Sequence, residues 1–249
     1  MRIDVYKITD EALNTYETDV GTTKVPPIWG NALTAEDYSR LIHPRYERLG
    51  DVLTPAEVGC TLSHLHAYRL IAARGKPSLI LEEDIELNKI SLEAVTSYVN
   101  FWPVDFLQAG AYGWSGGIRR DYGRPVALGL FVGYPRIGMR GTFAYFIRPR
   151  VAEQLLKFHD EELRRADQWD EFFHARDVVP YLAPIFLHPP ERGNLDVQRR
   201  EQRTLSTPQL ASISFNRILS GSRGTMASVF RRIFNRRIRL SDHTAIVER

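Results

Sequence analysis

The sequence predicts an α/β layered domain, and three observations support this. Apolar runs rich in β-branched and aromatic residues alternate with segments of helical periodicity. No internal repeat and no low-complexity stretch interrupts that alternation. The chain has 249 residues, of which 43% are hydrophobic and 25% charged, so it can build a substantial core. This composition excludes a disulfide miniprotein and a disordered chain.

The first elements are a strand, a long connection and a strong helix. Ile3–Ile8 is predicted to be a strand. Residues 19–51 are polar and dotted with prolines, which predicts loop with short turns of helix. Thr54 and Glu57 form a capping-box pattern and Gly75 is a stop signal, so a helix is expected between them. Its apolar residues recur at helical spacing at Val58, Leu62, Leu65, Tyr68 and Ala72.

The rest of the body continues the alternation of strands and helices. The predicted strands are Leu79–Leu81, Phe106–Ala109, Val126–Val132, Gly141–Ile147 and an interrupted region at Val178–His188. The predicted helices are Ser91–Val99, with Ser91 as the cap, and Val151–Phe158, which Pro149 introduces.

The acid triplet Glu82-Glu83-Asp84 directly follows the buried run Leu79–Leu81. Adjacent carboxylates repel one another and are costly to bury unpaired, so a cation is expected nearby. Ligands of α/β sheets gather beyond the carboxyl ends of the strands, where these acids should emerge. A divalent cation shared with substrate phosphates is one interpretation, and a solvated or arginine-paired strand end is the other.

Two motifs carry a family resemblance. Glu57–His64 (EVGCTLSH) and Leu79–Ile85 (LILEEDI) are similar to the paired signature of glycosyltransferase family 25. Gly141–Ile147 resembles the GTxAYII strand of that family, and Ala166–Trp169 its later PxDxxL element. The family includes lipooligosaccharide β-galactosyltransferases and collagen galactosyltransferases.

The resemblance implies a GT-A-like nucleotide-sugar domain over residues 1–201 with a mixed, mostly parallel sheet. It also implies inverting transfer from a UDP-sugar, most often UDP-galactose, with Mn²⁺ or Mg²⁺. Asp84 and Glu82 are then expected at the metal, and Glu82, Glu83 and Thr9 at the donor. Two departures from the family pattern stand out: the first strand lacks its arginines, and Arg165 replaces the proline of PxDxxL.

Inverting transfer requires a base, and Asp167 and Asp170 are the candidates. Both are expected on one helix, where their i, i+3 spacing puts them on the same face; a solvated acidic face is the alternative. His188 near the end of the body is a candidate additional metal ligand or a structural histidine. His64 is expected to be a hydrogen-bonded packing residue, and the single cysteine, Cys60, a small buried apolar one.

A glycine-rich stretch at residues 110–117 follows a predicted strand. It is either an acceptor-side loop, with Tyr112 or Trp114 stacking on a sugar, or a plain loop with a packed tryptophan.

Charge is unevenly distributed. Residues 1–201 hold 24 Lys and Arg against 28 Asp and Glu, whereas residues 202–241 hold eight Arg and no acid, within an overall net charge of +3. We expect residues 202–249 to be a linker followed by a basic amphipathic helix. Its apolar stripe comprises Met226, Val229, Phe230, Ile233, Phe234 and Ile238.

That helix suits an anionic membrane surface over residues 225–240, or it docks on the acidic body. No spanning segment or signal peptide is evident, so a cytoplasmic enzyme, peripheral on the inner membrane and acting on a glycolipid or oligosaccharide acceptor, is expected. Nucleic-acid binding is not expected, because no recognised module accompanies the charge. The alternative function is a catalytically silent glycan- or nucleotide-binding relative, or a transferase with another donor or a protein acceptor.

Overall fold

The computed structural model describes residues 2–111, 122–127, 129–133, 141–187 and 236–237. The strands are β1 (Asp4–Ile8), β2 (Thr23–Val25), β3 (Ser78–Glu82), β4 (Phe106–Ala111), β5 (Tyr122–Ala127), β6 (Leu130–Gly133), β7 (Ala144–Ile147), β8 (Pro180–Leu187) and β9 (Arg236–Arg237). The helices are α1 (Thr15–Asp19), the 3₁₀ helix η1 (Gly30–Ala32), α2 (Ala35–Leu49), α3 (Pro55–Arg74), α4 (Lys89–Phe101), α5 (Pro149–Glu161) and α6 (Trp169–Ala175). Within these ranges, no helix is long and apolar enough to cross a membrane.

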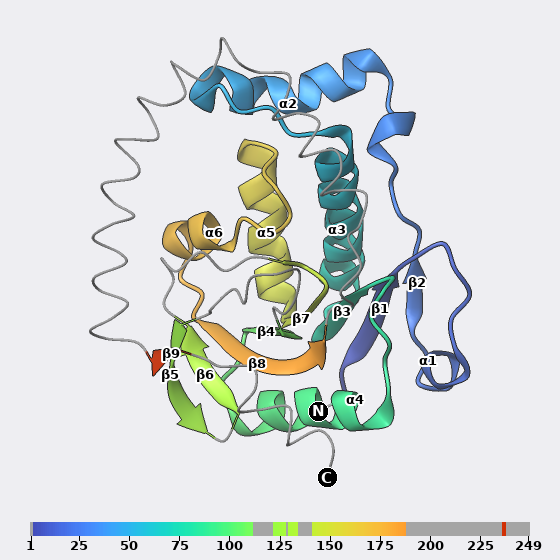
Figure 1. Ribbon diagram of the computed structural model, residues 1–249, viewed down its shortest axis with the longest axis vertical. Coiled ribbons are helices and arrows are strands. Elements are labelled where there is room, and N and C mark those ends of the chain that lie inside the picture. The colour runs from blue at the N-terminus through green and yellow to red at the C-terminus, as the bar shows by residue number, and fades with distance from the viewer. Residues whose placement is uncertain (1, 112–121, 128, 134–140, 188–235, 238–249) are drawn as a thin grey trace.

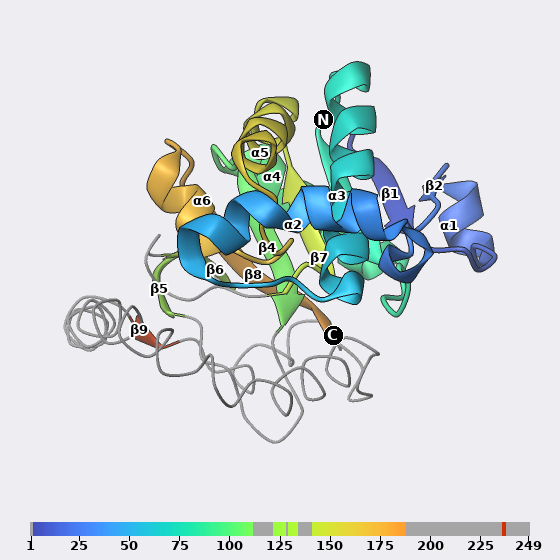
Figure 2. The ribbon, with the colours of Figure 1, turned by 90° about the horizontal axis from the view of Figure 1, so that it is seen from above.

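One sheet organises the fold, with strand order β2-β1-β3-β7-β4-β8-β6-β5-β9. Helices α3 and α5 cover one face and α4 covers the other (Figure 1). Seen from above, β1 and β2 lie at one side of the sheet and β5 and β6 at the other (Figure 2). The predicted α/β class and mixed sheet are confirmed.

The expectation of a mostly parallel sheet is wrong. Only β1 with β2, β1 with β3, and β4 with β8 pair in parallel among the described strands. The other five pairings are antiparallel, because β7 enters the middle of the sheet in the opposite direction and the β5–β6 hairpin and β9 extend its far edge. This hairpin replaces the single strand expected at Val126–Val132.

Helix α3 follows its sequence signals closely. Thr54 accepts from the Glu57 amide and Glu57 reciprocates, while Gly75 ends the helix at a φ of 64°. Helix α4 has a similar capping box, but its N-cap is Asn88 and the predicted cap, Ser91, is the third helical residue.

The loop expected over residues 19–51 is wrong for its second half, where α2 spans 15 residues. Thr34 caps it and Gly50 ends it, and Pro44 lies inside it. Its polar composition misled the prediction: Tyr38, Leu41 and Ile42 pack against the core, and the buried Arg45 and the half-exposed Arg48 both bond Glu162. This pairing holds α2 across the ends of α3 and α5 (Figure 1).

Most of the basic tail, and so the proposed boundary at residue 201, lies outside the described residues. Arg236 and Arg237 are described and form β9, which pairs with Tyr122 and Gly123 of β5. At these two positions the backbone is therefore extended rather than helical.

His159, at the end of α5, makes stability depend on pH. Burial, with Arg164, His64 and Arg45 adding positive charge, lowers its pKa from 6.5 to about 3. The unfolded chain therefore takes up this proton first, so the free energy of unfolding falls as the pH drops below about 6.5. We expect His159 to contribute a loss of about 1.5 kcal/mol between pH 6.5 and 5.

Urea unfolding of the wild type and His159→Asn across that range measures this contribution. Asparagine retains an acceptor for the Arg164 amide, which bonds His159 Nδ1 at 3.4 Å, but does not titrate. The variant should show the shallower dependence on pH; equal slopes would contradict the assignment. Glu162 contributes little to the pH dependence in this range. Burial raises its pKa, but Arg48, Arg164 and Arg45 lower it by more, so the pKa lies below 4.5 and the carboxylate is protonated only at lower pH.

Candidate active site

The motif residues gather at one edge of the sheet. Strands β1, β3, β4 and β8 all end at this edge, and the antiparallel β7 begins there. Thr9 follows β1, Glu82 ends β3, and Gly141 precedes β7. Residues far apart in the sequence are thus brought together where α/β sheets bind their ligands.

A chain of side-chain hydrogen bonds joins three of the motifs. His64 of α3 contacts Tyr145 Oη through Nδ1 at 2.7 Å and Glu82 Oε1 through Nε2 at 3.2 Å. The Tyr145 hydroxyl donates to the Tyr68 hydroxyl at 2.8 Å, and the Thr142 hydroxyl donates to Glu82 Oε1. The expectation that His64 is a hydrogen-bonded packing residue is confirmed, and the chain ties α3 to both β3 and β7.

The inner end of this chain, at Tyr68 and Tyr145, is fully buried. Burial raises the pKa of the Tyr68 and Tyr145 hydroxyls well above 10, and the proximity of Glu82 raises both further. The two tyrosines therefore remain protonated and act as hydrogen-bonding groups at physiological pH. Glu82, which is only half-buried, is the outer end.

The remaining residues of the α3 motif fix how the helix packs. A Cβ on Gly59 would lie 2.4 Å from the Ile28 carbonyl oxygen, and one on Gly30 would lie 1.7 Å from that of Pro55. Both positions therefore require glycine, and the 28–30 segment lies directly against α3. Ser63 strengthens this contact by accepting from the Ile28 amide at 2.8 Å.

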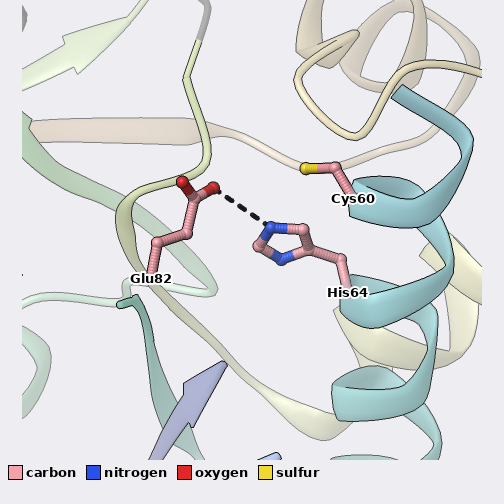
Figure 3. Close-up of side chains that lie close together, drawn as sticks. All are labelled: Cys60, His64 and Glu82. Atoms are coloured by element: carbon pink, nitrogen blue, oxygen red, sulfur yellow. Dashed lines mark hydrogen bonds and ion pairs between the residues drawn. The ribbon is translucent and has the colours of Figure 1, made fainter. Parts of the chain in front are cut away.

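Cys60 lies one turn before His64, on the same side of α3. It is half-buried rather than fully buried as expected. Its sulfur, the nearer His64 nitrogen and a Glu82 carboxylate oxygen all lie within 4.8 Å of one another. Figure 3 shows the three side chains converging between α3 and the end of β3. Nothing in the cysteine count suggested this grouping, but the helical i, i+4 spacing of Cys60 and His64 was a usable signal.

The three acids of the triplet have different surroundings at this edge. Glu82 is bonded by His64 and Thr142, whereas Glu83 and Asp84 form an exposed turn. Glu83 accepts from the hydroxyl of the buried Thr9 at 3.0 Å, so the structure brings together these two predicted donor-site residues.

Lys7, the basic residue of β1, forms a buried ion pair. Lys7 Nζ bonds Glu17 Oε1 at 2.7 Å, and both side chains are largely buried. Lys7 therefore fixes α1 against β1.

Asp167 lies at the same edge, beside the start of β7. Its carboxylate accepts from the Gly141 amide at 3.3 Å, and Trp169 Nε1 donates to the Gly141 carbonyl at 2.9 Å. Gly141 has a φ of 89°, a conformation that glycine adopts without strain.

Asp170 differs from the expected arrangement. It lies in the first turn of α6, but Asp167 precedes that helix, so the two do not share a helical face. Both carboxylates are half-buried, which differs from a freely solvated acidic face.

The segment before Asp167 is fastened to α3. Arg165 bonds Glu57 at 2.8 Å, and the Arg164 carbonyl accepts from the Thr61 hydroxyl at 3.0 Å. The arginine that replaces the family's proline is thus a positioning contact. Burial lowers the pKa of Arg165, but its ion pairs with Glu57 and Asp51 raise it above the ordinary arginine value.

Several predicted residues cannot be placed. His188 directly follows the described end of β8 and lies outside the described residues. Tyr112 and Trp114 of the glycine-rich stretch lie outside them too.

The exposed acids fit only part of a Mn²⁺ or Mg²⁺ site. Among the described residues, Cys60, His64 and Glu82 form the only group of three or more metal-ligating side chains. Glu83 and Asp84 do not make a closed cage, but a pair of exposed carboxylates completed by diphosphate oxygens is a usual arrangement for a hard cation. Asp84 with Glu83 would hold such an ion.

The motifs that meet at this edge resemble those of a glycosyltransferase family, and comparison with known proteins supports that class. Residues 28–114 match the family model described as "Glycosyltransferase family 25 (LPS biosynthesis protein)". The match covers 87 of the 249 residues, from η1 to β4, and it supports the family that the motifs predicted. No curated protein matched the chain.

Removing the Tyr145 hydroxyl tests the hydrogen-bonded chain. Tyr145→Phe leaves both His64 Nδ1 and the Tyr68 hydroxyl without this buried partner, so we expect a loss of about 1–3 kcal/mol in the free energy of unfolding. Urea denaturation measures it, with Tyr46→Phe on the exposed face of α2 as the control. If the two substitutions cost the same, the chain does not carry the stability assigned to it.

Proposed function

We propose that this protein is an inverting glycosyltransferase that transfers a hexose, namely galactose from UDP-galactose, to a core sugar of lipopolysaccharide or lipooligosaccharide. One observation carries the proposal: the family motifs meet at one sheet edge that presents two exposed acids and a separate, half-buried aspartate. The family description supports the LPS acceptor.

Donor binding is assigned to the turn after β3. Asp84 and Glu83 would hold a divalent cation together with the diphosphate, and Thr9 fixes Glu83 by its hydrogen bond. When bound, that cation neutralises charge on the departing diphosphate. Glu82, expected at the metal, is turned toward His64 and Thr142, so we assign it to holding the site together.

Asp167 is assigned as the base. The backbone amide of Gly141 orients its carboxylate, and the Arg165 and Thr61 contacts fix the preceding segment. From there it would take the proton of the acceptor hydroxyl, a role worth about 10²–10⁴ in rate. Asp170, in the first turn of α6, is the second candidate.

An assay of UDP release with a panel of UDP-sugars, with and without Mn²⁺ or Mg²⁺, tests this function. We expect UDP-galactose to be preferred, Asp84→Asn to lower turnover at least about 100-fold, and Asp167→Asn to lower it about 10²–10⁴-fold. Glu86→Gln is the matched control, because Glu86 is exposed two residues beyond Asp84.

The outcomes of this assay are distinct. Full activity of Asp84→Asn would overturn the metal assignment, and full activity of Asp167→Asn would overturn the base. No turnover with any UDP-sugar and oligosaccharide acceptor would instead favour a silent binding relative.

We also propose that the basic tail brings the enzyme to an anionic membrane surface, where a lipid-linked acceptor would be found. Each arginine near such a surface contributes about 1 kcal/mol. The support is the charge distribution, with eight arginines and no acid over residues 202–241. The pairing of Arg236–Arg237 with β5 favours contact of that short segment with the body.

Vesicle co-sedimentation of the full chain tests membrane binding. Replacing four tail arginines by glutamine should weaken binding to anionic vesicles about 10³-fold and leave neutral vesicles unaffected. The substituted positions are Arg231, Arg232, Arg236 and Arg239. The matched control replaces four exposed cations of the body, namely Arg40, Arg69, Lys89 and Lys157. Equal effects of the two sets would contradict a tail-specific contact.

A further inference from the structure

We propose that Cys60, His64 and Glu82 form a binding site for a transition metal ion, with Zn²⁺ as the best-suited ion. This site differs from the donor cation assigned to Asp84 and Glu83 in its ligands and in its position. Its three ligand atoms come from one turn of α3 and the last residue of β3, and all lie within 4.8 Å of one another. The close-up in Figure 3 shows Cys60 and His64 directed toward Glu82.

The ligand types select the class of metal. A thiolate and an imidazole are ligands for Zn²⁺ and similar borderline ions, whereas Mg²⁺ and Mn²⁺ prefer oxygen. Three protein ligands with a fourth position left for water or substrate is the usual composition of a catalytic or accessible zinc site. The set of one sulfur, one nitrogen and one carboxylate therefore favours zinc over the cation proposed for the donor.

Zinc binding requires only a small movement of the three ligand atoms toward one another. Tetrahedral ligands at zinc bond lengths of about 2.0–2.3 Å lie about 3.5 Å apart. His64 Nε2 and Glu82 Oε1 are already 3.2 Å apart. No separation in the group exceeds 4.8 Å, so none has to shorten by more than about 1 Å, which rotation about the Cys60 and Glu82 side-chain bonds supplies.

The surroundings hold two of the ligands in place. The Tyr145 hydroxyl bonds His64 Nδ1 at 2.7 Å, which orients the ring with Nε2 toward Glu82. Thr142 bonds the Glu82 carboxylate, and Tyr68 in turn fixes Tyr145. Such outer contacts are the usual companions of metal-bound histidine and carboxylate, and losing one typically costs 10–100-fold in metal affinity.

Metal binding to the full-length protein tests the site directly. Chelator-treated protein is loaded with Zn²⁺, the bound metal per chain is measured by elemental analysis, and affinity by competition with a chromophoric chelator. We expect one Zn²⁺ per chain, with affinity reduced at least about 100-fold in Cys60→Ser and in His64→Gln and about 10–100-fold in Tyr145→Phe. Loading with Co²⁺ should produce a thiolate-to-metal charge-transfer band that Cys60→Ser lacks.

Two control variants make the outcomes decisive. His66→Gln removes a histidine two residues away on another face of α3 and should retain full affinity. Asp84→Asn should also retain it, and a loss there would assign the ion to the acid triplet instead. A wild type that retains no Zn²⁺, or a Co²⁺ spectrum unchanged in Cys60→Ser, would overturn the proposal.

The test is independent of the proposed transferase activity. Binding is measured without donor or acceptor, so a failed turnover assay does not affect it, and the absence of zinc does not affect the UDP-sugar result. Cys60→Ser changes a half-buried residue by one atom, and its unfolding midpoint verifies that the variant is folded.

Discussion

The hydrogen bonds of His64 are the contact on which the candidate site depends. A buried polar group left without a partner is costly, so a chain of such groups is stable only when every member lies within hydrogen-bonding distance of the next. That requirement fixes α3 against β3 and β7, because Glu82 and Tyr145 come from those strands. The relative position of the three family-like motifs follows from this one condition.

A second set of polar contacts extends the same framework to Asp167. The loop before α6 is tied to α3 twice, by Arg165 with Glu57 and by the Arg164 carbonyl with Thr61. Glu57 also caps α3, so one carboxylate serves both the start of the helix and the placement of the loop. Helix α3 therefore positions both the candidate base and the β3 acids, although they lie some 85 residues apart in sequence.

Local signals predicted much of the fold. The capping box at Thr54, the glycine stop at Gly75 and the apolar run before Glu82 each describe a short stretch, and the structure agrees with them. Helix α2 was missed because its polar residues have distant partners, as Arg45 has in Glu162, 117 residues away. The direction of β7 was missed for a similar reason, since strand polarity is a property of the whole sheet. In the site, the position of Glu82 at a strand end was predicted, but the grouping of Cys60 with His64 and Glu82 depended on tertiary geometry.

The position of β7 has a consequence for the order of assembly. Strands β3 and β4 follow each other in the chain, yet β7 lies between them in the sheet and pairs with both. Until residues 144–147 have been synthesised, the earlier strands cannot form one continuous sheet in this topology. The stretch matched by the family model, residues 28–114, is therefore not a self-sufficient folding unit. During synthesis, the edges of β3 and β4 stay unpaired until β7 is made, more than 30 residues after β4. Their free backbone groups could pair with another chain in that interval, so these edges need protection from mispairing.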